Sequence, residues 1–171
     1  MRYVSFRRPD GTPSFGRLDG ETIVELATDA TLSRKAALTD GSLATLPDGA
    51  SFAAADIVLL PVIPDPAKIL CVGLNYAEHV KETGREQKAH PAIFVRYADS
   101  LVADGQPMVK PAVTDRFDYE GELAIIIGKA AHKVAAADAW SYVAGYAAFN
   151  DGSARDWQRH NIQFTPGKTF P

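Results

Sequence analysis

Cysteine, long apolar runs and excess basic charge are scarce or missing in this sequence. Cys71 is the only cysteine among 171 residues, so no disulfide can form within the chain and a reducing compartment is expected. No apolar run approaches the roughly 20 residues that a membrane-spanning helix needs. Residues 1–8 have neither a long apolar stretch nor a small-residue cleavage site of the signal-peptide kind. We therefore expect a soluble, cytoplasmic protein without a membrane partner.

The charge balance argues against a nucleic-acid partner. The formal net charge is −3 and the isoelectric point is about 5.8, and the few adjacent basic residues form no basic stripe. The composition, with 46% hydrophobic and 23% charged residues, is that of an ordinary globular protein. A chain of 171 residues is long enough for one medium domain, or for a small domain with part of a larger one.

Residues 1–62 are expected to form a small N-terminal β-rich domain. Residues alternate between polar and apolar over Tyr3–Phe6, and Asp19-Gly20 separates two β-type segments as a tight hairpin turn does. Three prolines within Pro61–Pro66 exclude a helix interior and a central strand. We therefore place the domain boundary in this proline-rich segment.

Residues 63–171 are expected to form the N-terminal portion of a larger domain that is mostly β. Short apolar strands alternate there with turns and with two short helices. The expected strands are residues 68–72, 92–96, 101–109 (as strand, turn and strand), 119–127 and 142–149, and the expected helices are residues 76–83 and 153–158. This pattern predicts an α+β fold with few helices.

The segment Asp118-Tyr-Glu-Gly-Glu-Leu-Ala-Ile-Ile-Ile-Gly128 is the most informative part of the sequence. In a strand, Glu120 and Glu122 would share one face, and the apolar run after them is expected to be buried on both faces. Two carboxylates that enter a dry region repel each other and lose hydration. A bound Mg²⁺, Mn²⁺ or Ca²⁺ ion would compensate their charge. The alternative is a strand end whose glutamates face water.

Two other places combine residues that suit catalysis. His79 and Glu82 lie three positions apart on an expected helix, so the carboxylate could raise the pKa of the imidazole and fix its tautomer, as a general base requires. The alternative is an ordinary surface pair. Asp151 follows an apolar strand, where proteins often present ligands, and the alternative there is a plain Asx turn.

Basic and polar side chains follow Asp151. Arg155 and Gln158 are expected on one helix face, and Lys168 lies ten residues beyond Gln158. A guanidinium, a carboxamide and an ammonium together suit a substrate that carries a carboxylate. The alternative is a solvated helix face.

Four segments together resemble the fumarylacetoacetate hydrolase family, in its shorter bacterial branch with a small N-terminal domain. They are Cys71-Val-Gly-Leu-Asn-Tyr-Ala-Glu-His-Val-Lys-Glu82, Asp118-Tyr-Glu-Gly-Glu-Leu-Ala-Ile-Ile-Ile-Gly-Lys129, Gly145-Tyr-Ala-Ala-Phe-Asn-Asp-Gly-Ser-Ala-Arg-Asp-Trp-Gln158 and Gly167-Lys-Thr-Phe170. They span residues 68–171 in the order of the family. The resemblance implies a mixed β-roll or sandwich, incomplete here, because such proteins continue beyond this chain with further strands and dimer contacts.

The resemblance also implies roles for individual residues. Glu120, Glu122 and Asp151 would bind one divalent ion, usually Mg²⁺ or Mn²⁺. His79 and Glu82 match the base pair of the family, and Lys168 matches a catalytic lysine that approaches the substrate. Arg155 and Gln158 match substrate-binding polar residues beside the metal aspartate. Gly152 departs from the larger apolar residue of many relatives.

The implied function is hydrolysis of a C–C bond in an acylpyruvate-like 2-oxo acid, of the fumarylpyruvate or fumarylacetoacetate type and typical of aromatic catabolism. A metal ion that polarises a 2-oxo acid also serves isomerisation, decarboxylation or dehydration, so these reactions stay open. An inactive fragment that acts as a structural module is a further alternative. A homodimer is expected for the full-length domain.

Overall fold

The computed structural model describes residues 1–26, 34–82, 84 and 89–171. By their internal contacts, these residues form two compact units, each described by itself. One unit comprises Met1–Asp65, Val102–Pro107 and Gly121–Asn150, and the other comprises Pro66–Leu101, Met108–Glu120 and Asp151–Pro171. The domain limits 1–62 and 63–171 stay a prediction, because this grouping follows packing rather than chain order. No helix in the described residues is long and apolar enough to cross a membrane.

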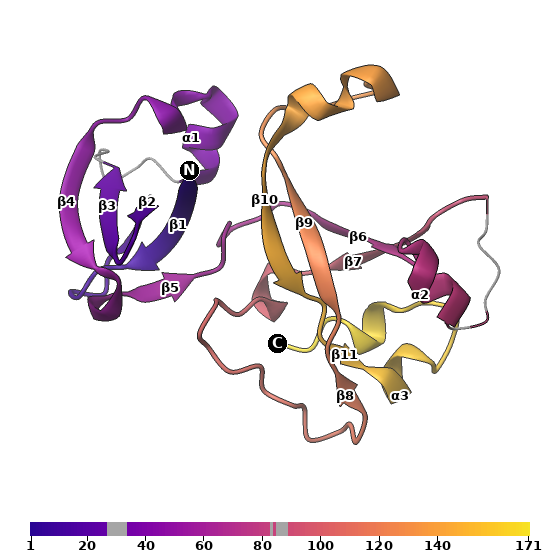
Figure 1. The fold of residues 1–171 in the computed structure, drawn as a ribbon. Coiled ribbons are helices and arrows are strands. Elements are labelled where there is room, and N and C mark those ends of the chain that lie inside the picture. The colour runs from indigo at the N-terminus through magenta and orange to yellow at the C-terminus, as the bar shows by residue number, and fades with distance from the viewer. Residues whose placement is uncertain (27–33, 83, 85–88) are drawn as a thin grey trace. The chain divides into compact units, whose positions relative to one another are not determined.

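The first unit contains a five-stranded antiparallel sheet in the order β4-β3-β2-β1-β5 (Figure 1). Its strands are β1 (Arg2–Arg7), β2 (Pro13–Asp19), β3 (Thr22–Leu26), β4 (Asp48–Ala53) and β5 (Val58–Leu60), and short 3₁₀ helices η1 (Ser42–Ala44) and η2 (Ala54–Asp56) connect them. The predicted hairpin is confirmed, since Asp19 pairs with Thr22 and Gly20 has the positive φ of 61° that its turn requires. Strand β4 was not predicted, because Asp-Gly-Ala-Ser lacks the alternation of a strand.

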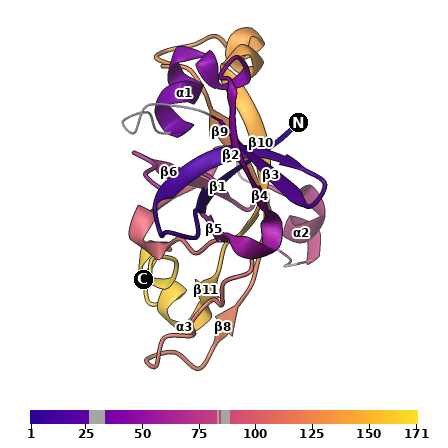
Figure 2. The ribbon, with the colours of Figure 1, turned by 90° about the vertical axis from the view of Figure 1, so that its left-hand side faces the viewer.

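A small core closes one end of this sheet. Helix α1 (Arg34–Asp40) and η1 contribute Ala37 and Leu43, which pack with Phe15 and Leu26 of the sheet. Figures 1 and 2 both show α1 at that end. Burial of these apolar side chains stabilises the sheet, because apolar surface removed from water stabilises by about 25 cal/mol per Å².

The same unit contains an antiparallel hairpin of β9 (Gly121–Ile127) and β10 (Val143–Asn150), joined through the 3₁₀ helix η4 (Ala136–Tyr142). The expected burial of β9 on both faces is wrong for the described residues. Leu123, Ile125 and Ile127 are 59%, 48% and 59% exposed. The apolar run predicted a strand correctly, but only the face that carries Glu122 is half-buried, because pairing with β10 satisfies the edge of β9 and does not cover its faces.

The second unit is built from short pieces. Strands β6 (Ile69–Gly73) and β7 (Ala92–Arg96) pair, and β8 (Phe117–Asp118) pairs with β11 (Ser153–Ala154). The helical segments are α2 (Ala77–Glu82), η3 (Ala98–Ser100), α3 (Arg155–Gln158) and η5 (Thr165–Gly167). Figure 1 shows β8, β11 and α3 together near the C-terminus.

Three local predictions between residues 101 and 158 need correction. Residues 101–109 form no strand: a turn is present, in which Gln106 N donates to Ala103 O at 3.2 Å, but the flanking residues pair with no strand and Pro107 lacks an N–H. The strand expected from residue 119 starts at Gly121, so Glu120 lies between β8 and β9. Helix α3 starts at Arg155, because Ser153 and Ala154 pair with β8.

Candidate functional site

Asp151 is buried directly beyond the end of β10. The whole residue is 3% exposed. Its N–H donates to the Glu120 carbonyl at 2.9 Å. This bond ties the start of the β11–α3 segment to the residue between β8 and β9. The Asp151 carboxylate accepts from Arg96 and Lys168 instead of capping its own turn, so the plain Asx turn is wrong.

Lys168 is the centre of the site. Its Nζ donates to Glu120 Oε2 and to Asp151 Oδ2, at 2.7 Å each, and lies 5.3 Å from the centre of the Phe94 ring. Lys168 follows η5, where Gly167 packs against α3: a Cβ at Gly167 would lie 2.4 Å from Gln158 N. Only glycine permits this approach, and the approach places the buried ammonium between the two carboxylates.

Two arginines bind the other oxygens of the same carboxylates. Arg96, the last residue of β7, donates from Nη1 to Asp151 Oδ1 and, at 3.1 Å, to the Gly152 carbonyl. Arg155 Nη1 donates to Glu120 Oε1, and its Nε donates to Asp118 Oδ2 at 2.9 Å. The resulting charge network alternates in sign through Arg96, Asp151, Lys168, Glu120, Arg155 and Asp118.

The network favours the charged forms of Glu120, Asp118 and Arg155. Burial alone would raise the pKa of Glu120, but hydrogen bonds and charges from Lys168 and Arg155 outweigh it and hold that pKa below the ordinary glutamate value. The hydrogen bond from Arg155 likewise lowers the pKa of Asp118. Burial acts to lower the pKa of Arg155, and its two carboxylate partners raise it overall. At neutral pH Glu120 and Asp118 are therefore ionised.

The structure brings together five of the eight predicted site residues: Glu120, Asp151, Lys168, Arg155 and Gln158, whose Oε1 accepts from Arg155 at 3.1 Å. Glu122 belongs to the other unit, half-buried in β9 opposite Phe149. Glu82 is exposed at the end of α2, and the His79 side chain lies outside the described residues. Within the described part of the chain, no three His, Cys, Asp or Glu side chains are grouped to hold a metal, so the three-carboxylate set stays a prediction.

The donor chemistry nevertheless fits a hard divalent cation. Glu120 Oε2 and Asp151 Oδ2 already share one cation at 2.7 Å, so they lie no farther apart than twice that distance. Carboxylate oxygens are the ligands that Mg²⁺ and Mn²⁺ prefer. Glu120 and Asp151 are thus able to hold such an ion if Lys168 moves.

Sequence reasoning missed Arg96 and Asp118. Arg96 closes an apolar strand, and its side chain is 6% exposed. A buried arginine requires a partner, and this was the signal available in the sequence. Asp118 stands two positions before Glu120 in the motif itself. The spacing of residues in the sequence could not show that Asp118 and Glu120 both bind Arg155, because this contact depends on how β8 pairs with β11.

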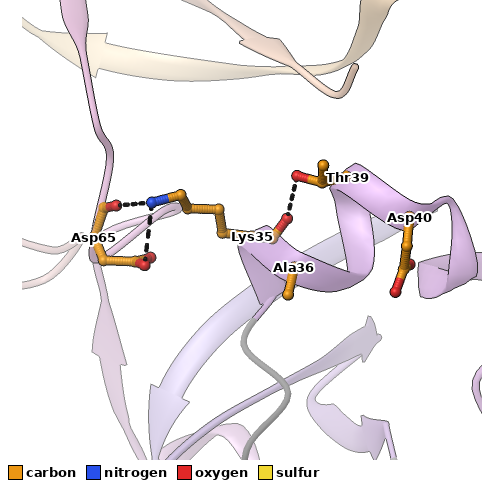
Figure 3. Close-up of a pocket in the computed structure, with 5 residues that line it drawn as sticks. All are labelled: Lys35, Ala36, Thr39, Asp40 and Asp65. Carbon is orange, nitrogen blue, oxygen red and sulfur yellow. Dashed lines mark hydrogen bonds and ion pairs between the residues drawn. The ribbon is translucent and has the colours of Figure 1, made fainter. Parts of the chain in front are cut away.

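Two surface hollows in the described residues are lined by no residue of the charge network. Figure 3 shows the one in the N-terminal unit, where Lys35 Nζ donates to the Asp65 carbonyl at 2.8 Å and Thr39 Oγ1 donates to the Lys35 carbonyl at 2.8 Å. It contains none of the predicted site residues. The other hollow is lined by residues 72–75 and 89–92. It includes Leu74, whose φ of 56° is strained for a leucine and turns the chain from β6 towards α2.

Comparison with known proteins agrees with the motifs. Residues 68–171 match the model of the fumarylacetoacetate (FAA) hydrolase C-terminal family, and residues 1–61 match that of the Rv2993c-like N-terminal family. The chain belongs to the fumarylacetoacetate hydrolase family. The mostly β fold predicted from this resemblance is confirmed by solved relatives in the family.

Relatives within the family have different named activities. Human oxaloacetate tautomerase FAHD2A, named as mitochondrial, is 39% identical over 67% of this chain and 37% of its own length. A 2-hydroxyhepta-2,4-diene-1,7-dioate isomerase from Mycobacterium marinum has a TM-score of 0.77 and 32% identity, over 99% of this chain and 61% of that one. A maleylpyruvate hydrolase from Sphingobium sp. SYK-6, solved with manganese(II) and pyruvate, has a TM-score of 0.69 and 27% identity, over 91% of this chain and 60% of that one.

The chain covers less than half of the length of some curated relatives. The chain spans 35% and 44% of two of the curated relatives that it matches. Membership in the family supports an enzyme, whereas the activity of the whole protein is a matter of proposal.

Proposed function

We propose that the protein is a divalent-metal-dependent enzyme that acts on acylpyruvate-like 2-oxo acids. The observation that carries this proposal is the convergence of Glu120 and Asp151 on one buried cation. Two carboxylates that share a cation supply the hard oxygen ligands of a Mg²⁺ or Mn²⁺ centre. The manganese and pyruvate bound to a relative of 27% identity support this choice of ion and substrate class.

Each predicted residue has a role in this proposal. Glu120 and Asp151 would hold the ion, with Glu122 as a third ligand. When bound, the ion would polarise the 2-oxo acid. Arg155 and Gln158, already linked at 3.1 Å, would orient the substrate carboxylate. Lys168 would stabilise negative charge that develops on the substrate, and His79 with Glu82 would remove a proton.

C–C hydrolysis is the first candidate reaction. His79, assisted by Glu82, would take a proton from water, and the water oxygen would bond to the distal carbonyl carbon of the substrate. The bond from that carbon to the methylene carbon would then break. Its electron pair would pass into the pyruvate part as an enolate, which accepts the proton at the methylene carbon. The products would be a carboxylic acid and pyruvate.

Isomerisation or tautomerisation is the second candidate. It needs only the removal of a proton and its return to another atom of the same 2-oxo acid. A relative at 39% identity is named a tautomerase, and a solved relative at 32% identity is named an isomerase. Decarboxylation and dehydration follow from the same enolate. The homodimer and the cytoplasmic location stay predictions.

Glu120→Gln tests the metal assignment. The amide lacks the charge that binds a divalent ion, so we expect loss of Mn²⁺ binding by calorimetry and loss of turnover with acylpyruvates. Glu21→Gln is the control, because Glu21 is exposed and lies in the N-terminal sheet unit. Full activity of Glu120→Gln would show the assignment to be wrong. Mass analysis of products separates the reactions: hydrolysis gives two carbon fragments, and isomerisation leaves the formula unchanged.

A further inference from the structure

Lys168 occupies the position of a shared cation between the two carboxylates. We propose that Lys168 is the built-in counter-ion of the metal-free centre, and that a divalent ion and the Lys168 ammonium exclude each other at Glu120 and Asp151. The inference rests on the proposed function, because it requires these two carboxylates to be metal ligands. It adds that ion binding releases a cationic side chain at the substrate site.

The oxygen partners support this exclusion. In each carboxylate one oxygen binds an arginine, Arg96 for Asp151 and Arg155 for Glu120. The arginines thereby fix the rotation of the carboxylates, and the remaining oxygens, Asp151 Oδ2 and Glu120 Oε2, turn towards the same ammonium. The point that both oxygens face is the point where a shared metal ion would lie.

Burial makes two cations at that point incompatible. The Lys168 side chain is 1% exposed, so little water screens its charge. A Mg²⁺ ion bound at about 2.1 Å from its oxygens would lie beside an ammonium that donates to the same oxygens. Like charges this close repel strongly, although Glu120, with 25% of its side chain exposed, leaves the site partly open to water. The ammonium has to leave before the ion binds both carboxylates.

We expect the ammonium to leave while the backbone of the site stays in place. The Lys168 backbone is held by η5, where its N–H donates to the Thr165 carbonyl at 3.0 Å, and Gly167 is packed against α3. Only the four-carbon side chain then needs to change rotamer. The Phe94 ring lies 5.3 Å from Nζ and contributes a cation–π contact to the present position of the ammonium. The released ammonium would meet an anionic substrate next to the ion.

The test is a titration with Mn²⁺ alone, in which electron paramagnetic resonance measures the free ion. We expect Lys168→Met to bind Mn²⁺ at least about tenfold more tightly than the wild type, which is about 1.4 kcal/mol. Lys168→Arg keeps the charge and should stay within about threefold of the wild type. Lys35→Met is the matched control, because Lys35 pairs with Asp65 at an exposed surface, and it should leave the Mn²⁺ affinity unchanged.

A second measurement, of Tm with and without Mn²⁺, tests whether Lys168→Met is less stable because it lacks the counter-ion. Without its counter-ion, this variant should have a lower Tm than the wild type, and saturating Mn²⁺ should restore most of the difference. Equal or weaker Mn²⁺ binding by Lys168→Met, or a Tm that Mn²⁺ does not restore, would overturn the counter-ion role alone. If neither protein binds Mn²⁺, the proposed metal centre and the counter-ion role both fall.

Discussion

Replacing Arg96 by methionine should destabilise the unit that contains the charge network. Arg96 and Asp151 are 6% and 5% exposed at their side chains, so the pair is buried. Loss of one partner of a buried pair costs about 3–5 kcal/mol, because the other charge stays buried without compensation. Here Lys168 still compensates Asp151, but the Gly152 carbonyl also loses its donor. We therefore expect the lower value, about 3 kcal/mol.

Urea unfolding followed by tryptophan fluorescence measures this effect, since Trp157 lies in α3 of the same unit. In a thermal scan, the expected loss corresponds to a decrease in Tm of roughly 12–24 °C for a unit of about 70 residues. Arg17→Met is the matched control: Arg17 pairs with Asp48 at 3.0 Å, but Asp48 is 55% exposed. Loss of this pair should destabilise the protein much less, because water and salt screen charges at the surface. An equal loss of stability in Arg96→Met and Arg17→Met would refute the reasoning that burial of the ion pair decides how large the loss is.

Two further predictions concern packing and pH. Gly167→Ala should destabilise by about 1–3 kcal/mol because its Cβ would meet Gln158 backbone, whereas Gly152→Ala, whose Cβ would meet the flexible end of Met108, should cost less in the same urea assay. A reversed order would contradict this account. The hydrogen bond from Thr114 lowers the pKa of Asp156, so its stabilisation is present above about pH 3.9, the unfolded value, and is lost as the pH falls through the folded pKa. Asp156→Asn should reduce this acid sensitivity, and an unchanged dependence of unfolding free energy on pH would exclude the role of Asp156.

Particular elements show where sequence reasoning succeeds. Local chemistry decides the β2–β3 hairpin, since Asp19-Gly20 suits its turn and the flanking residues alternate. Local chemistry also indicated that Asn150-Asp-Gly152 ends the strand expected over residues 142–149, and β10 ends at Asn150. Residues 101–109 carry apolar residues and a turn as a hairpin does, yet they form no strand, because a strand requires a partner with which to pair.

The candidate site was predicted only in part, because its contacts also depend on partners from other segments. The motif around Glu120 suggested a carboxylate that needs a cation, and the resemblance pointed to Lys168. Neither could show that Lys168 itself is that cation in this structure. The period-2 argument for Glu120 and Glu122 assumed one continuous strand, but the chain leaves β8 at Asp118 and enters β9 only at Gly121.

The sequence by itself determined the family, the mostly β class and the identity of the residues that can ionise, because motifs, alternation and side-chain chemistry are local properties of a chain. Only the tertiary structure decided the partners. Arg96, Asp151 and Lys168 come from segments far apart in the chain, and their pairing depends on how β7, β11 and η5 pack. Charge compensation depends on distances between atoms of different segments, and such distances exist only after the chain has folded.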